Sequence, residues 1–202
     1  LRTLWKTERF QHAAAVFESP GPSFRKQLDS DYKANRAPAP VDLKCQVAMV
    51  RVACECLGLR TIHVEGYEAD DVMGTLAKKA IECEQAVTIV SNDKDLAQVL
   101  ALSPRVELLR TSQAGRPERI TAKEVDKMYG VPPELITSWL ALRGDSSDNI
   151  RGVKGIGQKT AVKLLKEEGD IHTLLAEPER AGRFAKKFRE DRERILLDLN
   201  LA

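Results

Sequence analysis

An acidic stretch near residue 70 constrains the fold of this chain more than any other feature of its sequence. Glu68, Asp70 and Asp71 place three carboxylates within four residues, at the start of an apolar helical pattern that runs to about Glu84. A capped surface helix explains the stretch, because the helix macrodipole stabilises negative charge at its N-terminus. A metal site explains it equally well. The stretch alone does not separate the two interpretations.

Other acidic residues follow apolar segments elsewhere in the chain. They are Glu18, Asp93, Asp95, Asp145 and Asp148. The first three come directly after predicted strands, at 13–17 and 87–90. Functional sites in open parallel sheets lie beyond the carboxyl ends of the strands, so these acids are expected to face one crevice. Those of the stretch near residue 70 are expected to join them.

Carboxylates gathered in this way repel one another unless divalent cations neutralise them. The predicted cofactor is a pair of Mg²⁺ or Mn²⁺ ions, of the kind that phosphodiester-cleaving enzymes use. Structural zinc is disfavoured, because no set of cysteine and histidine ligands accompanies the acids. The predicted metal ligands are Glu18, Glu68, Asp70, Asp71, Asp93, Asp95, Asp145 and Asp148.

Composition sets broad limits on the class of protein. The 202 residues are 43% hydrophobic, which is enough for one or two domains with a real core. A net charge of +2 does not by itself indicate a nucleic-acid partner. No apolar run has the length of a membrane span or a signal peptide, so an intracellular or organellar protein with no membrane partner is expected. The four cysteines, at 45, 54, 56 and 83, lie in helical patterns and are expected to be buried thiols.

The hydrophobic pattern predicts an α/β chain that becomes helical towards its C-terminus. The predicted strands are 13–17, 61–64, 87–90 and 106–110, with 119–120 pairing back onto the last of them. The predicted helices are 41–57, which is expected to belong to the core, then 69–84, a segment after Asp95, 121–129, 132–144, 158–168 and 183–202.

Five stretches carry a resemblance to a known family. They are PSFR at 22–25, DYKANRAP at 31–38, GYEADDV at 66–72, SNDKDL at 91–96 and GDSSDNIRGVKGIGQKTAVKLL at 144–165. Their order and sequence resemble the 5′–3′ exonuclease domain of bacterial DNA polymerase I and its stand-alone relatives, the 5′-nuclease or flap-endonuclease family. The set spans most of the chain and is far more specific than any one acidic pair.

This resemblance implies a PIN-like 5′-nuclease fold, with a mainly parallel sheet flanked by helices in residues 1–137 and a helical DNA-binding region in 138–202. It implies metal-dependent hydrolysis of DNA at 5′ ends, flaps or nicks, in replication or repair, by a monomer. RNA–DNA hybrids are a further substrate to consider. Without the resemblance, residues 19–40 would be predicted to form a solvated loop with a short helix. In the family, the segment at about 19–45 begins an arch over the active site.

The resemblance also implies residue roles. Glu68, Asp70 and Asp93 form the core of one ion site, and Asp95, Asp145 and Asp148 hold the second ion. Lys33 and Arg36 of the arch segment act beside the first set as catalytic residues. Arg25 joins them in contacting phosphates, and Tyr32 stacks on a base.

The turn at 152–160 alone predicts only a connection between helices, because a glycine-rich turn is a weak signal. The family has a helix–two-turns–helix there, which grips the DNA backbone and binds a monovalent cation, typically K⁺. The residues that this implies for DNA binding are Lys154, Gly155, Gly157, Lys159 and Thr160.

Two departures from the family pattern keep alternatives open. Glu18 stands where the family has an aspartate, and residues 1–12 do not supply the family's first strand with its metal-binding aspartate. A catalytically weakened, structure-specific DNA-binding module is therefore one alternative. A PIN-type ribonuclease is another, although that class lacks the glycine-rich duplex-binding turn.

Overall fold

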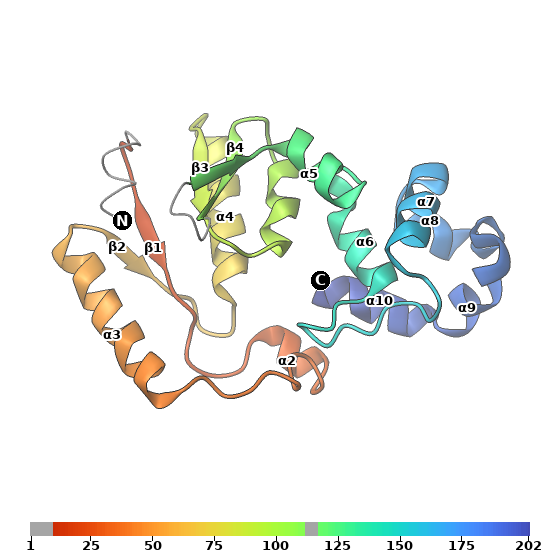
Figure 1. Cartoon of the computed structure of the whole chain (residues 1–202), viewed down its shortest axis with the longest axis horizontal. Helices are drawn as coiled ribbons and strands as arrows, with labels where there is room; N and C mark the ends of the chain where they lie inside the picture. The colour runs from red at the N-terminus through yellow and green to blue at the C-terminus, as the bar shows by residue number, and fades with distance from the viewer. Residues whose placement is uncertain (1–9, 112–116) are drawn as a thin grey trace. The chain divides into compact units, whose positions relative to one another are not determined.

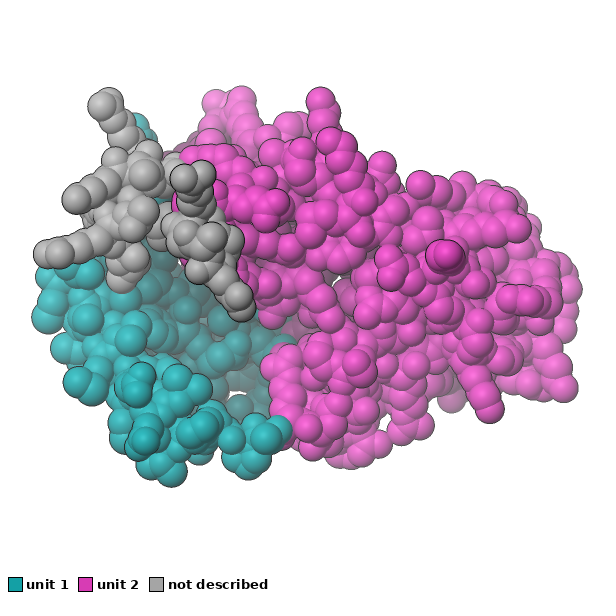
Figure 2. Space-filling model, in the orientation of Figure 1, with its two compact units in different colours: residues 1–23, 37–72 teal, residues 24–36, 73–202 magenta. Residues whose placement is uncertain are grey.

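The computed structural model describes residues 10–111 and 117–202. The chain divides into two compact units, coloured separately in Figure 2. Unit 1 is formed by residues 1–23 and 37–72, and unit 2 by residues 24–36 and 73–202. The expected domain boundary at 137–138 remains a prediction. The sequence also predicts the end of a helix at residues 1–5 and a turn-rich connection at 111–117. The first of these and the centre of the second lie outside the described residues. In the part of the chain that is described, no helix is both long and apolar enough to cross a membrane.

Unit 1 contains a parallel pair of strands and a long helix (Figure 1). Strand β1 (Ala14–Val16) pairs in parallel with β2 (Arg60–Ile62), and α3 (Val41–Cys56) contacts β2. Both strands were predicted, although β2 ends before His63. The chain turns soon afterwards, because Gly66 has a φ of 79° that favours glycine.

The prediction that α3 belongs to the core is wrong. Val47, Val50 and the capping residue Leu57 are 48%, 51% and 55% exposed, and Cys54 is the one fully buried residue of the helix. Apolar residues are spread around the whole helix, so a two-stranded sheet covers few of them. The prediction of buried thiols is also wrong for Cys45, Cys56 and Cys83, which are exposed, although all four cysteines are free.

Unit 2 is built on a mixed sheet with mainly helical surroundings. Strand β3 (Val87–Val90) runs parallel to β4 (Val106–Thr111), and β5 (Pro117–Ile120) pairs antiparallel with β4, as predicted. Helix α4 (Ala69–Glu82) begins in unit 1 and continues here. The segment after β3 is the 3₁₀ helix η1 (Asp95–Ala101). Helix α5 (Ala122–Tyr129) starts at a capping box formed by Thr121 and Glu124 and ends at Gly130.

The rest of unit 2 is helical. Its elements are α2 (Phe24–Leu28), η2 (Pro133–Leu135), α6 (Ile136–Arg143), α7 (Gln158–Glu168), α8 (Ile171–Ala176), η3 (Pro178–Phe184), α9 (Ala185–Glu190) and α10 (Arg192–Leu201). The predicted single helix at 183–202 is wrong, because the backbone leaves helical geometry at Asp191, with a ψ of 17°. Its predicted packing residues Phe184, Phe188 and Ile195 are nevertheless buried. Helix α10 contacts α2 and α6, so the C-terminal segment packs against residues from the start of the unit.

Candidate active site and nucleic-acid interface

Acidic residues from two segments of unit 2 line one cavity of about 260 Å³, called the acidic cavity here. Asp93 and Asp95 come from the end of β3 and the start of η1. Asp148 comes from the loop after α6. The remaining lining residues are Arg36, Asn92, Lys94 and Ser147. The family resemblance groups Asp95 with Asp148, and both line this cavity; their role as metal ligands remains a prediction.

Local turns fix the acids that follow β3. The Ser91 hydroxyl accepts a hydrogen bond from the backbone N–H of Asp93 at 3.1 Å, and Asp93 Oδ1 accepts one from the N–H of Asp95 at 3.0 Å. Such side-chain-to-backbone bonds reverse the chain within two residues. They lead the chain from β3 into η1 and hold Asp93 and Asp95 in place.

The carboxyl group of Asp95 has a strongly raised pKa. Burial is the main cause that raises its pKa to about 7, and the negative charges of Asp93, Asp148 and Asp145 add to it, against the opposing charge of Lys94. Its Oδ1 atom is buried without a hydrogen-bond partner in the described part of the chain. Buried carboxylate oxygen of this kind suits a hard divalent cation.

Asp145, in the loop after α6, forms an ion pair with Lys94, which follows β3. Burial acts to raise its pKa, but hydrogen bonds from Lys94 and Ser147 outweigh burial and hold the pKa below the usual range. Lys94 Nζ lies 2.5 Å from Asp145 Oδ2, and the backbone N–H of Ser147 donates to Oδ1 at 2.9 Å. Asp145 is therefore ionised at neutral pH.

Asp148 is the meeting point of the arch segment and the loop after α6. The Tyr32 hydroxyl donates to Asp148 Oδ2 at 3.1 Å, Lys33 Nζ lies 3.6 Å from the same oxygen, and Arg36 donates to Oδ1. Tyr32 is only 3% exposed and packs with Ile150 and Leu201. A ring buried in this way cannot stack on a base, so the stacking role predicted for Tyr32 does not agree with this structure. Arg25 donates to the backbone carbonyl of Leu201 at 3.0 Å.

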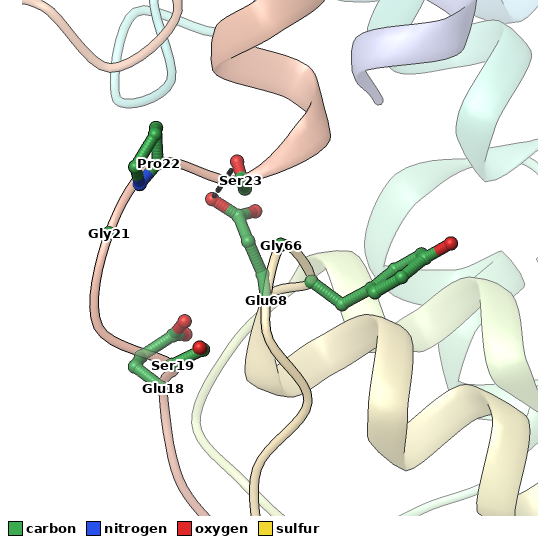
Figure 3. Close-up of a pocket in the computed structure, with 8 residues that line it drawn as sticks. Glu18, Ser19, Gly21, Pro22, Ser23, Gly66 and Glu68 are labelled. Carbon is green, nitrogen blue, oxygen red and sulfur yellow. Dashed lines mark hydrogen bonds between the residues drawn. The ribbon is translucent and has the colours of Figure 1, made fainter.

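The predicted ligands of unit 1 make contacts around the start of α4. The Ser23 hydroxyl donates to Glu68 at 3.4 Å, and both residues line a small pocket together with Glu18, Gly21 and Gly66 (Figure 3). Glu18 accepts a hydrogen bond from the N–H of Ala69 at 3.2 Å.

Asp71, in the first turn of α4, accepts a hydrogen bond from the N–H of Glu68 at 3.0 Å. The carboxylates of Glu18 and Asp71 thus satisfy backbone donors at a helix start, as the capped-helix interpretation predicts. Asp70 shares that first turn. The roles of these acids as metal ligands remain predictions.

The carboxylate oxygens of these acids are suitable ligands for a divalent metal ion, although some of the acids form ion pairs with lysine or arginine in this structure. In the described residues of each unit, no three His, Cys, Asp or Glu side chains form a ready group of ligands. In unit 2, Lys94 pairs with Asp145, and Lys33 and Arg36 pair with Asp148. The oxygen-only donors and the unbonded Oδ1 of Asp95 nevertheless match the preference of Mg²⁺ or Mn²⁺.

The predicted DNA-binding turn exposes its polar residues and buries its apolar ones. Val153 and Ile156 are 4% and 3% exposed, whereas Lys154 and Lys159 are exposed. Gly155 has a φ of 88°, and Gly157 is the N-cap of α7, which has no side-chain cap. The N-terminal N–H groups of α7 are thus uncovered by side chains, as an anion-binding helix start requires. Thr160 is in the first turn of α7 and is half-buried.

Sequence reasoning missed two residues of unit 2, of which Lys94 lines the acidic cavity. Lys94 lies inside the SNDKDL stretch, and a lysine between two aspartates is a signal that could have marked it as their counter-charge. It also missed Asp198, which is fully buried and accepts a hydrogen bond from the N–H of Gly152 at 2.9 Å. Asp198 stands between Ile195 and Leu201 at three-residue spacing, which places an acid on an apolar helix face.

Comparison with known proteins agrees with this geometry. Family models described as the 5′–3′ exonuclease N-terminal resolvase-like domain and the 5′–3′ exonuclease C-terminal SAM fold match residues 1–130 and 131–202. The thermostable DNA polymerase I of Thermus filiformis is 42% identical over 95% of this chain and 23% of its own length. A 5′–3′ exonuclease of Aquifex aeolicus is 36% identical over 96% of this chain and 65% of its own length. The chain therefore spans about a quarter of the first relative and about two thirds of the second.

A solved structure of the bacteriophage T5 D15 flap endonuclease has the same fold. It aligns with a TM-score of 0.81 and 22% identity over 99% of this chain and 76% of that chain. The predicted 5′-nuclease fold with a helical C-terminal part is confirmed. On the match of both family models, which together cover the whole chain, the protein belongs to the 5′–3′ exonuclease family.

Proposed function

We propose that this protein is a divalent-metal-dependent 5′–3′ exonuclease and 5′-flap endonuclease that hydrolyses DNA in replication or repair. The acidic cavity is the observation that carries the proposal. Burial and three neighbouring acids raise the pKa of Asp95 to about 7 there, and a divalent cation would relieve this repulsion. The name of the Aquifex relative, a 5′–3′ exonuclease, supports the reaction, and the T5 structure is a complex with DNA and metal ions.

Within unit 2, Asp93, Asp95, Asp145 and Asp148 would hold Mg²⁺ or Mn²⁺. When bound, such ions supply Lewis acidity for phosphodiester hydrolysis. The chain's own contribution is position and charge. Turns fix Asp93 and Asp95. Asp148 forms ion pairs with Lys33 and Arg36, and these cations can also neutralise a DNA phosphate. Glu18, Glu68, Asp70 and Asp71 remain proposed ligands from unit 1.

The turn at 152–160 is proposed as the contact with duplex DNA. Its exposed lysines and the uncapped start of α7 suit phosphates and carry no sequence information. The positive φ of Gly155 lets a phosphate or a K⁺ ion approach backbone atoms closely. Flaps, nicks and RNA–DNA hybrids are the proposed substrates, and the protein is proposed to act as a monomer.

A substrate panel tests this function. The protein is mixed with a 5′-labelled flap duplex, a blunt duplex or a single-stranded RNA of the same sequence, with Mg²⁺, Mn²⁺ or a chelator. We expect cleavage at the base of the flap and loss of cleavage in the chelator. Flap binding without cleavage in either metal would indicate a DNA-binding module. Cleavage of the RNA alone would indicate a PIN-type ribonuclease.

A further inference from the structure

The arch segment and the loop after α6 are joined a second time, away from the acidic cavity. Arg194 of α10 lies between two acids of unit 2. Its Nη1 atom is 2.7 Å from Asp29 Oδ2, and its Nη2 atom is 2.6 Å from Asp198 Oδ1. Asp29 belongs to the segment that carries Tyr32, Lys33 and Arg36. One guanidinium therefore links that segment to the C-terminal helix.

Asp198 extends this link to the loop that carries Asp145 and Asp148. Its Oδ2 atom accepts a hydrogen bond from the N–H of Gly152 at 2.9 Å. The loop is closed next to that point, because the backbones of Asp145 and Ile150 exchange hydrogen bonds in both directions, at 2.9 and 2.8 Å. A displacement of the Gly152 backbone would therefore move Ile150, two residues before it, and with Ile150 its hydrogen-bonded partner Asp145.

The ion pair of Arg194 and Asp198 is buried, and removing charged groups from water costs free energy. Asp198 is fully buried, and Arg194 and Asp29 are mostly buried, with side-chain exposures of 24% and 10%. Buried ion pairs often contribute little net stability compared with apolar residues of similar size. A leucine at position 198 would fill the same space in the core without a buried charge. Stability alone therefore does not explain the ion pair, and a role in placing the segments that it joins does.

We propose that Arg194 and Asp198 are positioning residues of the nuclease site. They set the loop of Asp145 and Asp148 against the segment of Tyr32, Lys33 and Arg36, and this inference rests on the proposed function. Neither residue touches the acidic cavity as a lining residue. Hydrolysis depends on the placement of acids and cations, and an error of about 1 Å can lower the rate about a hundredfold.

The test separates positioning from folding with a charge-neutral double variant. Arg194→Met with Asp198→Asn leaves the net charge unchanged and keeps an oxygen acceptor for the N–H of Gly152. Asp29 loses its ion pair with Arg194 but keeps the hydrogen bond from the N–H of Asp31. We expect its melting temperature without metal to stay within a few degrees of the native value. We expect its single-turnover rate on flap DNA to fall about 10-fold to 100-fold, and its dissociation constant for the same DNA to change less than about twofold.

Arg180→Gln is the matched control. Arg180 pairs with Glu168 and Glu177 in the same unit, on the exposed surface. This variant should cut at the native rate. Arg194→Lys should recover part of the rate that Arg194→Met loses, because an ammonium keeps the charge but lacks the two-pronged geometry.

Two outcomes of the cleavage assay would overturn the inference. One is a folded double variant that cuts at the native rate. The other is a rate loss that merely follows the unfolded fraction. Failure of the native protein to cut any flap would contradict the proposed function separately. The positioning role is then read from calorimetric titration with Mn²⁺, where the double variant should bind at least about fivefold more weakly and an unchanged affinity would overturn it.

Discussion

The hydroxyl of Tyr32 donates a hydrogen bond to Asp148 at 3.1 Å, across 116 positions of sequence. This bond connects the segment that the family uses as the base of its arch to an acid of the candidate metal site. Lys33 and Arg36 pair with the same carboxylate. One acid therefore shares three partners from a segment of five residues, and residues 32–36 belong to the same unit as the acidic cavity.

Tyr32→Phe tests whether Tyr32 supports the site or stacks on DNA. The change removes a buried hydrogen bond to an ionised group, so we expect a loss of about 1.5–3 kcal/mol in the free energy of unfolding, measured in urea. Cleavage should slow, while flap-DNA affinity stays within about twofold. A base-stacking role would give the opposite pattern, in which Tyr32→Phe is neutral and Tyr32→Ala weakens DNA binding without loss of stability.

Gly152→Ala should destabilise the protein far more than Gly157→Ala. Gly152 has a φ of 68°, and an added Cβ would lie 2.4 Å from the backbone nitrogen of Gly144. We expect a loss of more than about 3 kcal/mol, because a clash with backbone adds to left-handed strain. An alanine at 157 meets no atom within 4 Å, so it should cost less than about 1 kcal/mol as a changed N-cap. Urea unfolding of both variants checks this, and equal losses would contradict the described loop geometry.

The sequence predicted most elements of this fold because their signals are local. The capping box at Thr121 and Glu124 starts α5, and Gly130 ends it, as the residue types require. Asp93 and Asp95 follow β3 at the position that the β-branched run 87–90 predicts, and they line one cavity with Asp148. The burial of Tyr32 was not predictable in this way, since it depends on Ile150 and Leu201, which are more than 100 positions away in sequence.

The errors have related physical causes. Helix α3 has apolar residues on all sides, and periodicity does not reveal how few of them a two-stranded sheet covers. The break at Asp191 follows from the packing of α9 and α10 on different neighbours, which local propensity does not record. The pairing of Arg194 with Asp198 has the four-residue spacing of a helical ion pair, but the burial of Asp198 also depends on the N–H of Gly152, 46 positions away, which sequence alone does not bring near it.

The metal-free protein should show a pH dependence that Asp95 controls. Burial and neighbouring acids raise the pKa of Asp95 to about 7, from an ordinary value of 3.8. A raised carboxyl pKa favours the folded state at low pH, and this contribution is lost as pH rises from about 4 to about 7. Above that range the ionised carboxylate destabilises the folded protein.

Asp95→Asn isolates this effect, because asparagine resembles the protonated carboxyl. In a chelating buffer, the variant should melt close to the native temperature at pH 4, where Asp95 is protonated in the folded protein, and several degrees above it at pH 8. Melting curves by circular dichroism at the two pH values give the comparison. The same difference at both pH values would contradict the raised pKa.

DNA binding should be steep in salt and insensitive to sequence if the turn at 152–160 contacts phosphates. Replacing Lys154 and Lys159 with Ala should weaken binding equally for unrelated sequences and reduce the salt slope by about one to two units. Lys166→Ala is the control, since Lys166 lies in the last turn of α7. Fluorescence anisotropy at several salt concentrations measures the slopes. An unchanged slope would locate the DNA elsewhere on the protein.

The most direct test is the single-turnover rate of 5′-flap cleavage with Mn²⁺ by the native protein, Asp148→Asn and the control Asp126→Asn. Asp148 joins the arch cations to the acidic cavity, whereas Asp126 is exposed on α5. We predict cleavage at the flap base by the native protein and the control, and a loss of at least about a hundredfold in Asp148→Asn, with flap affinity nearly unchanged. Native-rate cleavage by folded Asp148→Asn would contradict a nuclease site at the acidic cavity.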